Sequence, residues 1–168
     1  MTTVTFPPFR EVVIKDKNGE EILVRMYDHE KDREKLIEMY LNYDPDYRCL
    51  GLPPLTRTGI ENWVDYLGKN GFAIIALKDE KVVGHLVIVP GEKNRVDLTI
   101  FIHQKYQNRG LGQEMMKLII DYCRKAGFEG IMLVTERTNT RAIHVYKKLG
   151  FEIVAPYYEY DMYLPLKK

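Results

Sequence analysis

Cysteine, long apolar segments and net charge are all scarce in this chain. Its two cysteines, Cys49 and Cys123, lie far apart and form no CxxC pair, which argues against a disulfide framework and against a bound metal. The longest apolar run, from Phe72 to Leu77, is far shorter than the roughly 20 residues that span a bilayer. No charged segment followed by an apolar stretch stands at the start, so we expect no signal peptide and a cytoplasmic protein without a membrane partner.

The charge balance and the composition indicate an ordinary globular protein. The 25 basic and 24 acidic residues give a formal charge of +1, which argues against a dedicated nucleic-acid binder, because such proteins carry a cationic excess. Hydrophobic residues make up 45% and charged residues 29% of the chain, which excludes a disordered or fibrous protein. We expect one domain over residues 1–168, with a core large enough to fold without disulfides.

Hydrophobic periodicity and turn signals predict helices and strands that alternate only in part. Asn18-Gly19 between two apolar runs predicts a tight hairpin. Thr58 and Glu61 form a capping-box pattern that begins a helix, and Gly127 is placed to end another. The order implies a mixed sheet with helices on both faces. The expected strands are at residues 11–15, 21–27, 72–77, 82–89, 95–103, 131–134, 151–154 and 158–164, and the expected helices at 31–43, 58–67, 110–126 and 139–149.

The segment from Val96 to Gly112 carries the clearest chemical signal. A strand ends near His103, a short polar link follows, and Gly110 and Gly112 open an amphipathic helix. The first amides of a helix lack acceptors and lie at the positive end of its dipole, and glycines let a phosphate approach the backbone closely. Arg109 adds a positive charge, so the pattern predicts an anion site. A glycine-rich turn without a ligand is the simpler interpretation.

Two spaced motifs together resemble the GNAT superfamily of N-acetyltransferases. The glycine pattern is neither a Walker A loop nor a dinucleotide fingerprint. Gln107-x-x-Gly110-x-Gly112 after a strand matches the family's motif A. The resemblance covers about Ile22 to Leu164, the expected core of the domain, although its N-terminal part depends on element order alone. A second segment, separated from motif A by one expected strand, is similar to the family's motif B helix. It reads Asn139-x-x-Ala142-x-x-x-Tyr146-x-Lys148-Leu149-Gly150-Phe151.

The resemblance implies an α/β (α+β) fold with a GNAT-type mixed, mostly antiparallel central sheet of about seven strands and helices on both faces. It also implies acetyl-CoA as co-substrate and transfer of the acetyl group to a primary amine by direct attack in a ternary complex. No cysteine lies on either motif, so an acetyl-cysteine step is disfavoured. Two alternatives remain, a non-catalytic acyl-CoA-binding module and an enzyme that acetylates an amine of a protein or peptide. A homodimer and a longer acyl donor are compatible with the same resemblance.

The resemblance places the cofactor along the motif A strand and loop. That strand would pair with the pantetheine through main-chain hydrogen bonds. A bulge would splay it from the strand at residues 130–135 and free an amide near Ile102 for the thioester oxygen. Asn139 matches the motif B asparagine that contacts the pantetheine, or it caps its own helix. The implied pyrophosphate contacts are Gln107, Arg109, Gly110, Leu111, Gly112 and Gln113, and the implied pantetheine contacts are Phe101, Ile102 and His103.

The same resemblance assigns the proton transfers. Tyr146 matches the family's tyrosine that protonates the departing CoA thiolate, which a phenol near the sulfur can do as a general acid; a core tyrosine is the alternative. The acceptor amine must lose a proton before it attacks. Asp97 is the leading choice for the base, because many family members carry an acidic residue on this strand. Glu136, His103 and His85 are alternatives, as is a base that acts through water.

The acceptor pocket is expected between the loop of residues 44–58 and the C-terminal hairpin. Acidic and aromatic side chains there would suit a cationic amine. Solvated turn acids and tyrosines that favour strands explain the same residues, and we prefer that simpler interpretation. The residues concerned are Asp44, Asp46, Tyr47, Tyr157, Tyr158 and Tyr160.

Overall fold

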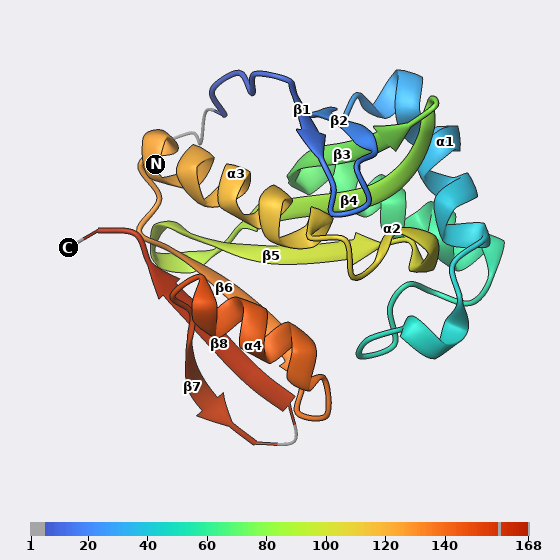
Figure 1. Cartoon of the computed structure of the whole chain (residues 1–168). Coiled ribbons are helices and arrows are strands. Elements are labelled where there is room, and N and C mark those ends of the chain that lie inside the picture. The colour runs from blue at the N-terminus through green and yellow to red at the C-terminus, as the bar shows by residue number, and fades with distance from the viewer. Residues whose placement is uncertain (1–5, 158, 168) are drawn as a thin grey trace.

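One sheet of eight strands crosses the molecule in the computed structural model, which describes residues 6–157 and 159–167. The strand order is β1-β2-β3-β4-β5-β6-β8-β7, and among the described strands only β5 and β6 run parallel (Figure 1). The number of strands is therefore close to the expected seven. The β1–β2 and β7–β8 hairpins near the two ends of the chain both belong to this sheet. The strands are β1 (Val12–Lys15), β2 (Glu21–Met26), β3 (Phe72–Lys78), β4 (Lys81–Pro90), β5 (Arg95–Ile102), β6 (Gly130–Glu136), β7 (Glu152–Pro156) and β8 (Glu159–Pro165).

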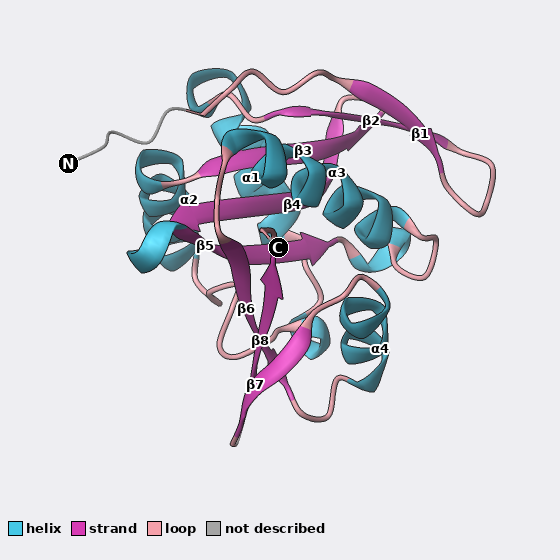
Figure 2. Ribbon diagram, turned by 90° about the vertical axis from the view of Figure 1, so that its left-hand side faces the viewer, coloured by secondary structure: helices cyan, strands magenta, loops and turns pink. Residues whose placement is uncertain are grey.

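The helices cover both faces of this sheet, as the sequence predicts. The first two lie on one face, and the last two lie on the other (Figures 1 and 2). Three short 3-10 turns connect the elements. The α-helices are α1 (His29–Leu41), α2 (Arg57–Asn70), α3 (Leu111–Ala126) and α4 (Thr140–Lys148), and the 3-10 turns are η1 (Pro45–Tyr47), η2 (Glu92–Asn94) and η3 (Gln104–Tyr106).

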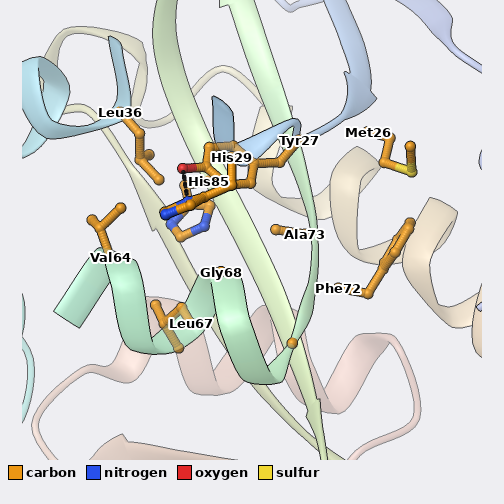
Figure 3. Close-up of a pocket in the computed structure, with 11 residues that line it drawn as sticks. Met26, Tyr27, His29, Leu36, Val64, Leu67, Gly68, Phe72, Ala73 and His85 are labelled. Carbon is orange, nitrogen blue, oxygen red and sulfur yellow. Dashed lines mark hydrogen bonds between the residues drawn. The ribbon is translucent and has the colours of Figure 1, made fainter. Parts of the chain in front are cut away.

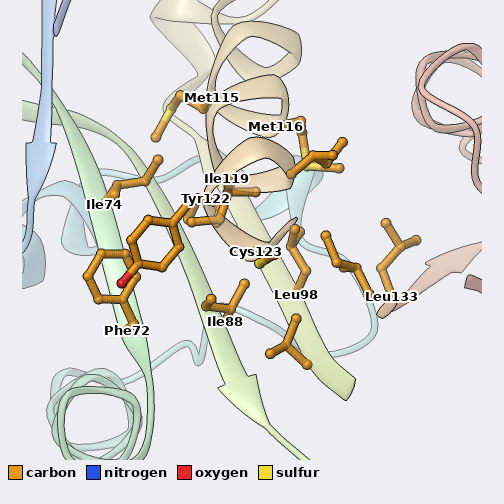
Figure 4. Packing of buried hydrophobic residues seen from close by; sticks show 14 of the residues in the cluster. Phe72, Ile74, Ile88, Leu98, Met115, Met116, Ile119, Tyr122, Cys123 and Leu133 are labelled. Carbon is orange, nitrogen blue, oxygen red and sulfur yellow. The ribbon is translucent and has the colours of Figure 1, made fainter. Parts of the chain in front are cut away.

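The larger core lies between α3 and the sheet (Figure 4). Met115, Ile119 and Cys123 recur at helical spacing on α3 and are fully buried, against strand residues that include Ile88 and Leu98. Burial of one such side chain stabilises the fold by about 1.5–3 kcal/mol. Because this stripe begins in the first turns of α3, it fixes the start of the helix against the end of β5.

The segment before β1 packs on the same core. The Phe6 ring stacks on Phe72 with centroids 5.3 Å apart, and Phe9 lies 6.1 Å from Tyr122. Tyr122 itself stacks on Phe72 at 4.5 Å, and its hydroxyl donates a hydrogen bond of 2.6 Å to the carbonyl of Pro7. Apolar packing thus includes the described residues that precede the first strand.

Two local predictions from the sequence are wrong in detail. The cap of α2 is Thr56 rather than Thr58, since the Thr56 hydroxyl accepts a hydrogen bond from the Gly59 amide at 3.0 Å. The continuous apolar run at 131–134 is typical of a strand covered on both faces, yet Val134 is 44% exposed. At this residue β6 has already diverged from β5 and pairs with β8 alone.

The loop between β1 and β2 is longer than the two-residue turn that Asn18-Gly19 predicts. The Asp16 amide donates to the Glu20 carbonyl at 2.9 Å, and the Gly19 amide donates to the Asp16 carbonyl at 3.0 Å. Gly19 has a positive φ of 81°, which favours glycine. The hairpin itself is confirmed, with a loop that spans residues 16–20.

A buried ion pair joins α1 to the sheet. Both carboxylate oxygens of Asp32 accept hydrogen bonds of 2.8 Å from the Arg25 guanidinium on β2, and the Asp32 side chain is only 2% exposed. One of these oxygens also accepts the Asp28 amide at 2.8 Å. The Arg25 hydrogen bonds hold the pKa of Asp32 below its ordinary value, against the opposing effect of burial. The pair therefore fixes the helix that leads into the α1–α2 loop.

We predict that Asp32→Asn lowers the free energy of unfolding by about 3 kcal/mol at pH 7, because it leaves the partly buried Arg25 without its counter-ion. A depressed carboxyl pKa gives stability that is present above the unfolded value near 3.9 and is lost as the pH falls through the folded value. Urea unfolding at pH 7 and pH 3 measures both effects. Asp65→Asn is the control, since Asp65 also pairs with an arginine, Arg33, but its side chain is 46% exposed and its loss should change stability far less. A loss as small as the control's would contradict the prediction.

Candidate functional site

β5 and β6 pair over a short stretch and then diverge (Figure 1). Their parallel register joins residues 95–97 to residues 130–132, and no strand in the described part of the chain pairs with the rest of β5 on that side. On its other side β5 stays paired with β4 from Val96 to Ile102, without a register shift. The expected bulge is therefore wrong. β6 itself stays paired with β8 along its whole length, from Gly130 to Glu136, so only the edge of β6 that faces β5 loses its partner.

Backbone groups of β5 point into the resulting gap. The His103 amide donates to the Val83 carbonyl on β4 at 2.9 Å, and hydrogen-bonding direction alternates along an antiparallel strand. The odd-numbered residues of β5 therefore bond to β4, and the amides of Ile100 and Ile102 face the gap. The Ile102 carbonyl already accepts the Gln107 side-chain amide at 2.9 Å. An unpaired strand edge thus lies inside the sheet, where a second extended chain could pair with it.

The loop after β5 turns sharply into α3. Asn108 and Gly110 have positive φ values of 65° and 81°, a conformation that favours glycine at the second position. Gly110 precedes the helix without a side-chain cap, so the amides of residues 111–113 have no partner within the helix. A Cβ at Gly112 would meet Ile102 at 3.6 Å, an ordinary contact. The feature of this turn that suits an anion is therefore its uncapped amides.

Arg109 is less available than the sequence suggests. Its guanidinium lies 2.9 Å from the Glu20 carboxylate and 3.6 Å from that of Asp16, both in or next to the β1–β2 loop. It also lies 4.9 Å above the Tyr106 ring. Two carboxylates therefore share its charge. The Arg109 side chain also ties the loop between β5 and α3 (residues 103–110), which we call the anion loop, to the hairpin of β1 and β2.

Polar side chains also tie the anion loop to the end of α1. The Asn42 carbonyl accepts from His103 Nε2 at 3.1 Å and from Gln104 Nε2 at 2.9 Å. Gln104 Oε1 accepts the Asp44 amide at 3.0 Å, and His103 Nδ1 accepts the Lys105 amide at 3.3 Å. Burial lowers the pKa of His103. Because both ring nitrogens are engaged, this imidazole is a poor choice for the base.

The motif B residues lie on α4, across the gap from β5. Burial and the nearby Cys49 raise the pKa of Tyr146 to about 12, so the phenol stays protonated at neutral pH. Its ring lies 6.0 Å from Phe151. Burial also raises the pKa of the Cys49 thiol, which disfavours the thiolate that a nucleophile requires. Asn139 Oδ1 accepts the Ala142 amide at 3.3 Å, so Asn139 caps the helix; its contact with a cofactor stays a prediction.

Tyr43 is a site residue that the sequence reasoning missed. It lies just beyond α1, is 8% exposed, and its ring is 5.7 Å from that of Phe101. Burial raises its pKa, with Cys49 and Tyr146 adding to the effect and Gln107 opposing it, so its hydroxyl lies among these groups. Tyr43 continues the apolar stripe of α1. The helical spacing of that stripe predicts that Tyr43 is buried, but it does not predict that Tyr43 lies beside both motifs.

The two acidic candidates for the base, Asp97 and Glu136, lie apart. Asp97 is exposed and is the last residue of β5 to pair with β6. Desolvation raises its pKa. It lies five residues, or about 17 Å along the strand, from Ile102. Glu136 ends β6, and its Oε1 accepts the Leu50 amide at 2.9 Å, close to Cys49. Asp97 is thus at the closed end of the gap, where β5 and β6 are still paired. Tyr146 lies near Cys49, as Glu136 does, toward the open end of the gap, where the two strands have diverged.

His85 belongs to a closed cluster on the other face of the sheet (Figure 3). It is 2% exposed, and its Nδ1 lies 2.6 Å from the Tyr40 hydroxyl. Burial lowers its pKa to about 3, so the ring is neutral. It borders a cavity of about 100 Å³, where the Tyr27 hydroxyl lies 2.8 Å from His29 Nδ1. The core interpretation of His85 is therefore favoured over the catalytic one.

The residues proposed for an acceptor pocket have ordinary local roles. Asp44 Oδ1 accepts the Asp46 amide at 2.9 Å and caps η1. The Arg137 guanidinium lies 5.5 Å above the Tyr160 ring. Tyr157 and Tyr47 are exposed, and Tyr158 lies outside the described residues. Within residues 6–157 and 159–167, no group of three or more potential ligands is arranged to hold a metal ion, and no helix is long and apolar enough to cross a bilayer.

Comparison with known proteins links this architecture to acetyltransferases. The sequence model described as the acetyltransferase (GNAT) family matches residues 33–151. The L-amino acid N-acetyltransferase AaaT of Escherichia coli is 35% identical over 85 residues, which are 48% of this chain and 52% of that protein. Spermidine N(1)-acetyltransferase of Escherichia coli is 34% identical over 73 residues, 40% of this chain and 37% of that protein. The chain therefore spans about half the length, or less, of these two relatives.

A solved acetyltransferase from Salmonella typhimurium, determined with its cofactor acetyl-CoA, superposes with a TM-score of 0.72 at 17% identity. The match covers 89% of this chain and 96% of that one, and it shows that the two share a fold. The expected fold class, a mixed and mostly antiparallel sheet with helices on both faces, is confirmed. Because the family model extends over both motifs and over the diverging strands β5 and β6, the chain belongs to the acetyltransferase (GNAT) family.

Proposed function

We propose that this protein is an acetyl-CoA-dependent N-acetyltransferase that moves an acetyl group to a primary amine by direct attack in a ternary complex. The observation that carries the proposal is the pair of unpaired amides of Ile100 and Ile102 on β5, which is followed by the uncapped first turn of α3. Extended pantetheine fits the first part and a pyrophosphate fits the second. Two relatives are named for acetylation of small amines, an amino acid and spermidine.

In this proposal the cofactor supplies an activated acetyl thioester, and the protein holds and polarises it. The amides of residues 111–113 bind the pyrophosphate, with Gln107, Gly110 and Gly112 shaping the loop. The amides of Ile100 and Ile102 face the gap, and we assign the thioester oxygen to one of them. A preorganised amide donor stabilises the charge that develops on that oxygen in the transition state, where it contributes more than it would in water.

Tyr146 is assigned the proton that leaves with CoA. As the new C–N bond forms and the C–S bond breaks, the sulfur takes a proton from the phenol. Its pKa of about 12 keeps the proton in place at the pH of the reaction. The raised thiol pKa of Cys49 favours direct attack over an acetyl-cysteine step, although this cysteine lies near the site.

We assign the base to Asp97, which the sequence analysis favours, and its raised pKa makes it a better proton acceptor. Its place at the closed end of the gap requires that the amine approach from there or that water relay the proton. Glu136 is the second choice for the base, because it lies near Cys49 and Tyr146 at the open end. The finer identity of the amine stays open between a small metabolite and the amine of a peptide.

Tyr146→Phe should lower kcat by about 10²-fold, the lower end of what general acid catalysis contributes, and should leave the affinity for acetyl-CoA unchanged. Release of CoA on a panel of amino acids, polyamines and peptides gives kcat, and titration calorimetry with acetyl-CoA, CoA and ATP gives affinity. Tyr157→Phe is the matched control, because Tyr157 is 74% exposed. An unchanged kcat would remove Tyr146 from the mechanism. Binding of acetyl-CoA without turnover on any amine would favour the non-catalytic module.

Asp97→Asn should lower kcat/KM by at least about 10²-fold and remove the acidic limb of the pH profile. A carboxyl base works only when it is ionised, so the rate falls as the pH drops below its pKa. Desolvation raises that pKa, so the acidic limb lies at a higher pH than it would for an ordinary aspartate. Glu136→Gln is the comparison variant. A normal profile for Asp97→Asn with a lost limb for Glu136→Gln would transfer the role to Glu136.

A further inference from the structure

We propose that Lys17, in the loop of the N-terminal hairpin, supplies the cation that neutralises the cofactor pyrophosphate. This inference rests on the proposed function and adds a residue that neither motif contains. Lys17 stands more than ninety residues before Arg109 in the sequence, yet the hairpin loop and the anion loop lie side by side (Figure 1).

The position of Lys17 is fixed by its backbone. Its amide donates a hydrogen bond of 2.9 Å to the Arg109 carbonyl, within the anion loop itself. Its side chain then runs over the next residue, because a Cβ at Gly110 would meet Lys17 Cε at 3.3 Å and Cγ at 3.7 Å. The ammonium group is one bond beyond Cε. It therefore lies close to the uncapped first turn of α3.

The hairpin loop is held in this shape by Asp16. Its Oδ1 accepts the amides of Asn18 and Glu20, both at 2.9 Å, and its other oxygen lies 3.6 Å from Arg109. The Asp16 side chain is only 1% exposed. A buried carboxylate that bonds its own loop and faces the anion loop makes the two loops one unit, so little ordering is needed when an anion binds.

Among the charged residues of the β1–β2 loop and the anion loop, Lys17 is the cation most available to a bound anion. Arg109, the cation that motif A suggests, lies within ion-pair distance of Glu20 and Asp16. Lys17 is exposed, and no described carboxylate lies within ion-pair distance of it. A pyrophosphate placed at the first turn of α3 would thus meet two carboxylates and one shared arginine unless Lys17 contributes its charge. A pyrophosphate ester carries negative charge that helix amides alone offset only in part.

Lys17→Met should weaken acetyl-CoA binding about tenfold, the loss expected when a hydrogen bond to a charged group is removed. The affinity should also depend less steeply on salt than it does in the wild type. The matched control is Lys15→Met, which removes the same charge two residues away from an exposed position on β1. Lys17→Arg should restore most of the affinity, and urea unfolding of each variant checks that the fold is intact.

Three ligands locate the contact. Acetyl-CoA and acetyl-dephospho-CoA should lose the same factor with Lys17→Met, since both carry the pyrophosphate, and acetyl-pantetheine should lose nothing. A loss confined to acetyl-CoA would place Lys17 at the 3′-phosphate and overturn the assignment, as would equal binding by Lys17→Met and Lys15→Met. In either case the wild type still binds acetyl-CoA and the proposed function stands. A wild type that binds none of the three ligands overturns both.

Discussion

The geometry of the site depends on the short pairing between β5 and β6. After three residue pairs β6 diverges from β5 while it stays paired with β8 on its other side, and the amides of β5 that would have bonded to it are left without a strand partner. Unpaired backbone groups inside a sheet cost free energy unless water or a ligand satisfies them. The sheet on both sides is well packed, with Val96 and Ile131 fully buried. The gap is therefore a permanent feature of the fold rather than a local defect, and it defines where an extended ligand can pair.

Segments far apart in the chain hold the end of this gap in place. The β1–β2 loop contacts the anion loop through the Lys17 amide and the Arg109 guanidinium. The end of α1 contacts it from another direction through Gln104 and Asn42. Both tethers are polar and partly exposed, whereas the apolar stripe of α3 fixes the helix itself. The loop that would bind phosphate is thus positioned by side chains whose roles are independent of any ligand.

Much of the fold follows from patterns that are local in sequence. The period of the apolar residues finds all four helices and all eight strands, and Gly127 ends α3 with a φ of 87°, as its position predicts. The motif A glycines locate the turn into α3. The cap at Thr56 and the five-residue hairpin loop differ from prediction because the side chains of Thr56 and Asp16 accept hydrogen bonds from nearby backbone amides.

The parts of the site that the sequence does not reveal are contacts over long distances. Tyr43, Cys49 and Lys17 each reach the site from another element, and nothing in their immediate sequence records where that element docks. Arg109 carries the expected charge, but its pairing with Glu20 depends on the hairpin. The splay of β5 from β6 arises without a register shift on β5, and no pattern within either strand marks the residue at which their pairing ends.

The central claim, that the free edge of β5 pairs with acetyl-CoA, is tested most directly by amide hydrogen exchange measured with and without the ligand. The amides of Ile100 and Ile102 should exchange faster than that of Phe101, which bonds to β4, and should slow at least about tenfold on saturation with acetyl-CoA. The Phe101 amide should not change. Unchanged exchange at Ile100 and Ile102 in a sample saturated with acetyl-CoA would contradict the account and place the ligand elsewhere on the molecule.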